Sequence, residues 1–214
     1  MKTIPLREFD ANPSLHEEVK HVLERGSLVC HPSPSGYKLV ADLGSPDAIT
    51  AMVRAKRRVG HAPSLVFLPD ETWVDKVAGA VSAEARKLMR GLWPGAVTLL
   101  FKASEDLHPK VRKPLTRAKG WLGVRVPDDP FCLAVVRAFG RPLLVSSANL
   151  SSKRGAHSLA QVKKNFGRTV DLLVDAGDIP PGTGSTLVDV SNGSPAVIRT
   201  GAVPEERILA ALAG

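Results

Sequence analysis

Short apolar runs alternate along the chain with longer segments in which apolar residues recur every three or four positions. The runs are typical of buried strands, and the periodic segments are typical of helices that pack one face on a sheet. The apolar runs predict strands at 27–31, 65–68, 97–101, 122–127, 142–145, 172–174, 186–190 and 197–199. A loop rich in proline and serine is expected at 31–37, directly after the first strand.

Capping residues mark the expected helix boundaries. Short polar side chains accept hydrogen bonds from the first amides of a helix, proline suits its first turn, and glycine often ends it. On these signals, helices are expected to follow Asn12, Ser45, Ser82, Asp129, Ser158 and Pro204. Strands that alternate with helices predict an α/β domain, and the short gap at 191–195 predicts a hairpin between the last two strands. We therefore expect a mixed sheet flanked by helices.

Length and composition suit one globular domain over residues 1–214. The chain has 214 residues, of which 43% are hydrophobic. Its two cysteines, Cys30 and Cys132, lie in apolar runs and are expected to be buried thiols. The N-terminus lacks the apolar core of a signal peptide, and no apolar run is long enough to span a membrane. We therefore expect a cytoplasmic protein with no membrane partner.

Charge and motifs narrow the function. Lys and Arg together number 29 against 21 Asp and Glu, which gives a net charge of +8. Such a charge favours the binding of polyanions, and it also serves solubility. Aromatic residues make up only 5%, which argues against a stacking platform for single-stranded nucleic acid. The chain lacks the phosphate-loop pattern, the dinucleotide-binding glycine pattern, the hydrolase nucleophile elbow and histidines at zinc spacing. No structural metal or serine hydrolase is therefore expected.

Candidate chemistry lies at strand ends, where ligands of open α/β sheets bind. The turn at 146–149 offers the hydroxyl of Ser147 and the amide of Asn149 to phosphate or ribose oxygens, and is equally compatible with an ordinary turn. Lys56 and Arg58 are two positions apart, so in an extended segment both would hold one polyphosphate. The same cations would otherwise complement a helix C-terminus.

Three more polar positions lie in or beside predicted strands. Arg125 interrupts an apolar strand, so it is either half of a structural ion pair or an arm that meets a ligand. Ser185 precedes a strand after a glycine- and proline-rich loop, and Arg199 ends the next strand. Each of these two residues either contacts a ligand or belongs to an ordinary loop without a functional role.

In this order, the segments resemble the YrdC-type domain, the family of threonylcarbamoyl-AMP synthases that includes the TsaC-, YrdC- and YciO-like proteins. The matching segments are Lys56-Arg57-Arg58, Trp93-Pro94-Gly95-Ala96-Val97-Thr98, Gly123-Val124-Arg125-Val126-Pro127, Ser146-Ser147-Ala148-Asn149-Leu150-Ser151, Ser185-Thr186-Leu187-Val188-Asp189 and Ile198-Arg199-Thr200-Gly201. The match spans about residues 10–210, and its order is more specific than any one segment. The resemblance implies a twisted open sheet with a concave, positively charged face.

The resemblance also implies an activity. Members of this family are nucleotidyltransferases that use L-threonine, bicarbonate and ATP to form threonylcarbamoyl-AMP and pyrophosphate. A partner, the t6A transferase complex, then transfers the threonylcarbamoyl group to an adenosine beside the tRNA anticodon. Positioning and charge neutralisation can drive such a reaction without a protein nucleophile. Mg²⁺ would arrive with ATP and not on a dedicated protein site.

By this resemblance, individual residues acquire roles. Lys56 and Arg58 would hold phosphates, and Arg125 would meet the substrate's carboxylate or the phosphates. The residues expected to contact the nucleotide are Thr98, Ser147, Asn149, Ser185 and Arg199.

One loop departs from the family pattern, which usually reads P-T-[DE]-T-V-Y-G-L and helps to bind threonine. This chain has Pro32-Ser33-Pro34-Ser35-Gly36-Tyr37-Lys38-Leu39. The acidic residue has become Pro34, and the glycine after the tyrosine has become Lys38. Ser33 and Ser35 keep hydroxyl groups, so a hydroxylated amino acid such as threonine would still find partners there.

The altered loop leaves a second function open. Its Ser35-Gly36-Tyr37 sequence is similar to that of the YciO-like branch. A paralogue of that kind, with weak or no synthase activity, would act as a double-stranded RNA-binding protein. The net charge of +8 suits tRNA or double-stranded RNA as a partner. Retention of the phosphate and nucleotide residues favours the synthase.

Overall fold

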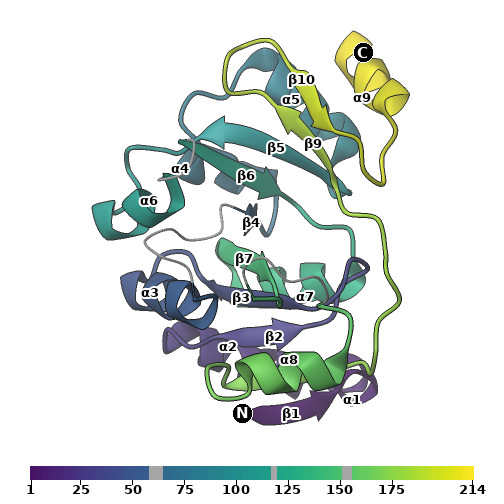
Figure 1. Ribbon diagram of the computed structural model, residues 1–214. Helices are drawn as coiled ribbons and strands as arrows, with labels where there is room; N and C mark the ends of the chain where they lie inside the picture. Colours follow the sequence, from purple (N-terminus) through teal and green to yellow (C-terminus); the bar gives the residue numbers. More distant parts are fainter. Residues whose placement is uncertain (58–64, 117–119, 151–155) are drawn as a thin grey trace.

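A ten-stranded sheet flanked by helices forms the centre of the protein (Figure 1). The computed structural model describes residues 1–57, 65–116, 120–150 and 156–214. The strands are β1 (Lys2–Pro5), β2 (Val29–His31), β3 (Lys38–Asp42), β4 (Leu65–Phe67), β5 (Val97–Lys102), β6 (Trp121–Arg125), β7 (Leu143–Ser147), β8 (Leu172–Asp175), β9 (Thr186–Asp189) and β10 (Ala196–Arg199). They lie in the order β1-β8-β2-β3-β7-β4-β6-β5-β9-β10, so the first and last strands form opposite edges.

The sheet is mixed, which confirms the prediction from the sequence. The pairs β1–β8, β8–β2, β4–β6 and β5–β9 are parallel, and the other five neighbouring pairs are antiparallel. The predicted hairpin joins β9 and β10, with a register shift between Val197 and Arg199. Such a shift is typical of a bulge at a sheet edge.

Helices connect most of the strands. They are α1 (Leu6–Ala11), α2 (Ser14–Glu24), α3 (Pro46–Ala55), α4 (Val74–Val77), α5 (Ala83–Leu92), α6 (Pro109–Thr116), α7 (Pro130–Phe139), α8 (Leu159–Phe166) and α9 (Glu205–Ala213), with a 3₁₀ turn η1 (Glu71–Trp73) before α4. Within the described ranges, none of them has both the length and the apolar character needed to cross a bilayer.

Most of the predicted caps are present. The side chains of Ser45, Ser82 and Asp129 each accept a hydrogen bond from the amide three residues later, at 3.2, 3.1 and 2.9 Å. Ser158 was wrongly identified as a capping side chain, because it makes no such bond. The carboxylate of Asp178 accepts from the first amide of α8 instead, at 2.8 Å, a contact that only the tertiary structure supplies.

Several elements escaped prediction. The strand β3 lies in the middle of the sheet with both faces buried, so its apolar run shows no alternation and follows a proline-rich loop without a boundary signal. Helix α6 contains Pro114, which disguises a helical pattern. The edge strand β1 and the short helix α1 lie before the first capping signal, and β1 is held by pairing with the distant β8.

Alternate residues of the central strands point to opposite faces of the sheet. In β7, Leu143 and Val145 pack in one apolar cluster with α2 and α7. Leu144, between them, packs in a second cluster that includes residues of α3. We call these two sides of the sheet the α7 face and the α3 face.

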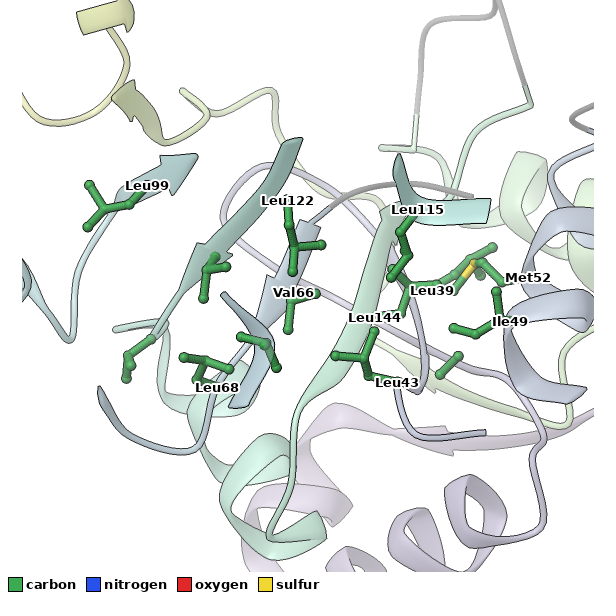
Figure 2. Packing of buried hydrophobic residues seen from close by; sticks show 14 of the residues in the cluster. Leu39, Leu43, Ile49, Met52, Val66, Leu68, Leu99, Leu115, Leu122 and Leu144 are labelled. Carbon is green, nitrogen blue, oxygen red and sulfur yellow. The ribbon is translucent and has the colours of Figure 1, made fainter. Parts of the chain in front are cut away.

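The α3 face carries a continuous apolar layer (Figure 2). Figure 2 shows side chains from helix α3 at one end, from the central strands next to them, and from β5 at the other end. The labelled residues that cross the sheet in this way are Met52, Ile49, Leu39, Leu43, Leu144, Val66, Leu68, Leu122 and Leu99. This layer fixes the strand order on which the site depends.

The α7 face is covered over only part of its width. Its apolar cluster combines α1, α2 and α7 with strands β1, β8, β2, β3, β7 and β4. Among the described residues, the cluster includes none from β6, β5, β9 or β10. We call the area over these four strands the helix-free half of the α7 face.

The apolar layer on the α3 face should dominate stability. Leu144 is fully buried, and Leu144→Ala should cost about 2–5 kcal/mol because the vacated space cannot be refilled. Leu209, which is 57% exposed, offers a matched control, and Leu209→Ala should stay within about 0.5 kcal/mol of the parent. Urea midpoints measure both changes, and equal midpoints for the two variants would contradict the packing described.

Candidate functional site

A buried lysine ties the turn at 146–149 to the end of α3. Lys56 is 0% exposed, and its Nζ donates to the backbone oxygen of Ser147 at 2.5 Å, to Oδ1 of Asn149 at 3.1 Å, and to the backbone oxygen of Asn149. The hydroxyl of Ser147 donates to the same Oδ1 at 2.5 Å. Three residues assigned to the site from the sequence therefore form one hydrogen-bonded group, which we call the lysine turn.

The backbone bends sharply directly after this lysine. The amide of Lys56 donates to the carbonyl of Met52 at 3.1 Å and ends α3, and the next residue, Arg57, has a φ of 50°. A positive φ is uncommon for a residue with a long side chain and persists where surrounding contacts hold it. Arg58 lies outside the described residues, so its partnership with Lys56 stays a prediction.

The hydrogen bonds of Lys56 limit how its ammonium group could contact a phosphate. An ammonium group has three protons, and three oxygens of the lysine turn accept from it. A phosphate oxygen would have to replace or share one of these acceptors. The ammonium also orders the turn, a role that sequence reasoning did not assign to it.

The loop at 32–37 lies beside the lysine turn because β3 pairs with β7. In this antiparallel pair, Lys38 lies opposite Ser147. One residue further out, the amide of Ala148 donates to the carbonyl of Tyr37 at 2.8 Å. The structure thus places the loop predicted to meet the amino acid next to the turn predicted to meet the nucleotide.

The two loop serines differ in their surroundings. Ser33 is only 7% exposed, and its hydroxyl donates to the carbonyl of Gly36 at 2.6 Å, which closes the loop. Ser35 is half-buried, and its carbonyl lies 3.5 Å from Nζ of Lys38. Contacts of either hydroxyl with an amino acid stay predictions.

The connection between β8 and β9, residues 176–185, links this part of the site to the other half of the sheet. The hydroxyl of Tyr37 donates to the carbonyl of Gly177 at 2.7 Å and accepts from the amide of Ala176 at 3.0 Å, and burial raises the pKa of this phenol to about 12. Further along, Gly182 packs so closely on the carbonyl of Pro34 that a Cβ atom would not fit. The connection then leads into β9.

A second hydrogen-bonded group lies where β5, β9 and β10 meet. The hydroxyls of Thr98 and Ser185 are 2.8 Å apart, and Nη2 of Arg199 donates to the carbonyl of Ser185 at 2.9 Å. The parallel pairing of β5 with β9 places Thr98 beside Leu187, which in turn pairs with Arg199. The three predicted nucleotide contacts on these strands are therefore neighbours, and we call them the hydroxyl–arginine group.

Arg125 lies on the α7 face at the end of β6, a strand that lies between β7 and β5 in the sheet. Its guanidinium sits 4.8 Å from the ring centre of Phe67, its neighbour across β4 and β6. Val124 pairs with Leu99 on the α3 face, so Arg125, which follows Val124, and Thr98, which precedes Leu99, both emerge on the opposite face. Arg125 and the hydroxyl–arginine group thus share the helix-free half.

The guanidinium of Arg125 is held in a largely apolar setting. Burial lowers its pKa from the ordinary arginine value, although Asp128 and Asp129 act in the opposite direction. Its Nε atom is buried and has no hydrogen-bond partner among the described residues. The ion pair considered from the sequence is not formed among these residues, and the ligand-binding alternative stays a prediction.

Two titratable groups beside the site were missed, the buried His31 and the half-buried Lys38. Burial lowers the pKa of His31 to about 4, and Nδ1 of this residue lies 2.7 Å from the carbonyl of Pro32. Burial, together with the charge of Arg125, lowers the pKa of Lys38 to about 8. The two residues are partners in the β2–β3 pair, which the sequence did not predict. The lysine at the family's glycine position was the only available signal.

The contacts of Lys56 imply a stability effect as well as a ligand effect. Lys56→Met should lower the free energy of unfolding by about 1–3 kcal/mol, because buried oxygens of the lysine turn lose their donor. Arg54→Met, on the exposed side of the same helix, should change it by less than about 0.5 kcal/mol. Urea unfolding measures both, and equal stability of Lys56→Met and the parent would show that the ammonium does not order the turn.

The buried imidazole of His31 should make the fold sensitive to acid. The pKa is about 4 in the folded chain and 6.5 for the free group, so the unfolded chain binds a proton that the folded chain excludes. Stability from this residue is fully present above pH 6.5 and falls by on the order of 2–3 kcal/mol as the pH drops through 4.

Urea midpoints between pH 7.5 and pH 4 should therefore fall less steeply in His31→Gln than in the parent. Aspartates and glutamates also titrate in this range, so the difference between the two slopes is the relevant quantity. His21→Gln, at an exposed position of α2, serves as the control and should keep the parental slope. Parallel curves for all three proteins would contradict the lowered pKa.

Comparison with known proteins yields a family and several relatives. Residues 21–201 match the Sua5/YciO/YrdC family, whose description reads "Telomere recombination". The chain is 29% identical over 206 residues to the threonylcarbamoyl-AMP synthase of Bacillus subtilis strain 168, which covers 96% of this chain and 58% of that protein. It is 32% identical over 196 residues to the threonylcarbamoyl-AMP synthase of Thiobacillus denitrificans, covering 90% of this chain and 97% of that protein.

Among solved structures, Sua5 of Pyrococcus abyssi complexed with L-threonine aligns with a TM-score of 0.78 at 25% identity. The alignment covers 92% of this chain and 57% of that one. The chain thus spans less than two thirds of the B. subtilis and P. abyssi proteins. The family model covers most of the chain, and the twisted mixed sheet agrees with the fold that the resemblance implied, so this chain belongs to the Sua5/YciO/YrdC family.

Proposed function

We propose that this chain is a threonylcarbamoyl-AMP synthase, a nucleotidyltransferase that joins L-threonine, bicarbonate and ATP. One observation carries the proposal. The lysine turn and the hydroxyl–arginine group come from segments far apart in the sequence, yet each is hydrogen-bonded internally, and β6, which carries Arg125, lies between β7 and β5 in the sheet. The synthase names of the relatives support the same activity.

In this proposal the lysine turn and the hydroxyl–arginine group both contact the nucleotide. Hydroxyl, amide and guanidinium donors suit ribose and phosphate oxygens, so the nucleotide contacts would be Thr98, Ser147, Asn149, Ser185 and Arg199. Lys56 and Arg58 would neutralise phosphate charge. Arg125 would meet the carboxylate or phosphate oxygens that lie between the groups.

The chemistry requires no covalent enzyme intermediate. The amine of threonine adds to bicarbonate and water is lost, which gives a carbamate. A carbamate oxygen then attacks the α-phosphorus of ATP, the bond to the β-phosphate oxygen breaks, and pyrophosphate leaves. Cations held in place stabilise the charge that develops on the phosphates, which is the largest contribution a protein makes to such a step.

Mg²⁺ would enter with ATP. Among the described residues, no three His, Cys, Asp or Glu side chains lie close enough together to hold a metal ion. The donors available on the helix-free half are hydroxyls and cations, which suit phosphates rather than Mg²⁺. The ion would therefore sit on the triphosphate oxygens.

Threonine and the later transfer step complete the proposal. The complex of P. abyssi Sua5 with L-threonine supports threonine as the amino acid, with the loop containing Ser33 and Ser35 as its binding segment. The product would pass to the t6A transferase complex and then to tRNA, which would place the protein in the cytoplasm. The alternative, a double-stranded RNA-binding protein with weak or no synthase activity, is motivated by the altered loop from Ser33 to Lys38, and the net charge of +8 suits such a partner.

Pyrophosphate release tests the proposal directly. The protein incubated with ATP, Mg²⁺, bicarbonate and each amino acid in turn should release pyrophosphate when L-threonine is present. Arg199→Met should raise the KM for ATP by about 10- to 100-fold, because a contact with a charged phosphate is worth about 1.5–3 kcal/mol.

Arg207→Met, at an exposed position of α9 outside both groups, is the matched control and should keep the parental KM. Release that no amino acid stimulates would reject the synthase. In that case, binding of duplex RNA that weakens steeply with salt would support the RNA-binding alternative.

A further inference from the structure

A groove between α3 and α6 lies outside the proposed nucleotide site. The two helices are neighbours (Figure 1), and the groove between them has a volume of about 780 Å³. Helix α6 is anchored on the α3 face by Val111 and Leu115, which are buried in the same apolar cluster as Met52 of α3. Thr98 and Arg125 emerge on the other face of the sheet, so the groove can serve a ligand of its own.

The α3 wall of the groove combines an apolar row with a polar row. The apolar residues at positions 46, 49 and 53 form one row, because residues three or four apart lie on the same side of a helix. The polar residues at 47, 50 and 54 form a second row beside it and are exposed. Ile49 is buried and Val53 is half-buried, so the apolar row forms the floor, and Pro114 of α6 adds apolar surface from the other side.

The rim of the groove is cationic. Arg54 of α3 and Lys110 and Lys113 of α6 are exposed and line it from both helices. Among the described residues, none of the three forms an ion pair, and Asp47 is the one acidic residue that lines the groove. Three unpaired cations against one carboxylate give the groove an excess of positive charge, which favours an acidic ligand.

The apolar floor distinguishes between acidic ligands. Nucleic acids are held through their phosphates by cations, and single strands are held in addition by aromatic rings that stack on the bases. Within the part of the chain that the structure describes, no aromatic side chain lines the groove. A phosphate backbone would leave Val53 and Pro114 without an apolar partner. An acidic peptide supplies both carboxylates and apolar side chains, and amphipathic segments commonly dock in apolar grooves.

The dimensions of the groove suit a short segment. The residues of α3 that line it run from Pro46 to Arg54, which is about 12 Å along the helix axis. That length matches about two turns of a bound helix. Lys110 and Lys113 are three positions apart on α6 and therefore lie on one side of that helix. Their ammonium groups can meet carboxylates that are about one turn apart in the bound segment.

We propose that the groove between α3 and α6 binds an acidic amphipathic segment of a partner protein. Apolar side chains of the segment pack on the floor of the groove, and its carboxylates pair with Arg54, Lys110 and Lys113. The interaction goes beyond the proposed function, because it uses none of the residues assigned to ATP, bicarbonate or threonine. Docking on this side of the sheet leaves the helix-free half of the α7 face open to substrates.

Peptide selection tests the proposal without turnover. The full chain is mixed with a pool of peptides about ten residues long, in which each position is Leu, Glu or Ala, and the bound peptides are identified by mass spectrometry. Peptides with Leu and Glu at intervals of three or four residues should be enriched. The Kd of an enriched peptide, measured by fluorescence polarisation, should rise with salt because the rim cations are exposed. Replacing its Glu residues by Gln should raise the Kd at least about tenfold.

Charge reversal locates the bound peptide. Lys110→Glu combined with Lys113→Glu should raise the Kd at least about tenfold, because each change replaces an attraction with a repulsion. Val53→Ser should also weaken binding, since the floor loses apolar surface. Lys164→Glu combined with Arg168→Glu makes the same change of charge at exposed positions outside the groove and should keep the parental Kd. Both charge-reversed proteins should keep the parental urea midpoint, which shows that they are folded.

Two results would overturn the proposal. One is a pool without enrichment, or an enrichment that the double variant of Lys110 and Lys113 does not reduce. The other is duplex RNA that binds at least about tenfold more tightly than every enriched peptide and loses this affinity in the double variant, because the groove would then serve nucleic acid. No sample contains ATP or threonine, so the outcome is independent of whether the chain is a synthase.

Discussion

The antiparallel pairing of β3 with β7 is the constraint on which the site depends. It sets Lys38 opposite Ser147 and joins the Tyr37 carbonyl to the Ala148 amide. A slip of one residue would turn every side chain of β3 to the other face of the sheet, because strand side chains alternate. Such a slip would turn the ammonium of Lys38 toward the apolar layer of the α3 face, and the cost of burying that charge opposes it.

Uneven covering of the α7 face explains why the site lies where it does. Helices α1, α2 and α7 fill the face over the strands from β1 to β4, and the apolar cluster ends there. Polar side chains such as Thr98 and Arg199 emerge from the strands beyond that limit, where backbone and loop groups bond to them. An apolar helix packed over these strands would offer such polar groups no hydrogen-bond partners, at considerable cost. The asymmetry of the fold therefore creates the site.

The local sequence pattern was sufficient to predict most strands of the sheet. Strands such as β5 and β7 are short, strongly apolar and bounded by clear turn residues, and both were predicted within two residues of their observed ends. β3 was missed because a central strand buried on both faces carries no alternation, and its loop resembles a longer irregular stretch. Missing this strand also concealed Lys38, since a residue cannot be assigned to a face before its strand is known.

Sequence alone determined the α/β class, the order of the polar segments from Lys56 to Arg199 and the family they resemble, because these depend on local periodicity and motif order. Tertiary structure decided which of those residues meet. The bonds between Lys56 and Asn149 and between Thr98 and Ser185 join positions about 90 residues apart in the chain. Burial and charge around Lys38 and Arg125 likewise arise from strands that are distant in sequence. Such contacts depend on strand order and register, and these follow from packing of the whole sheet, which no local pattern contains.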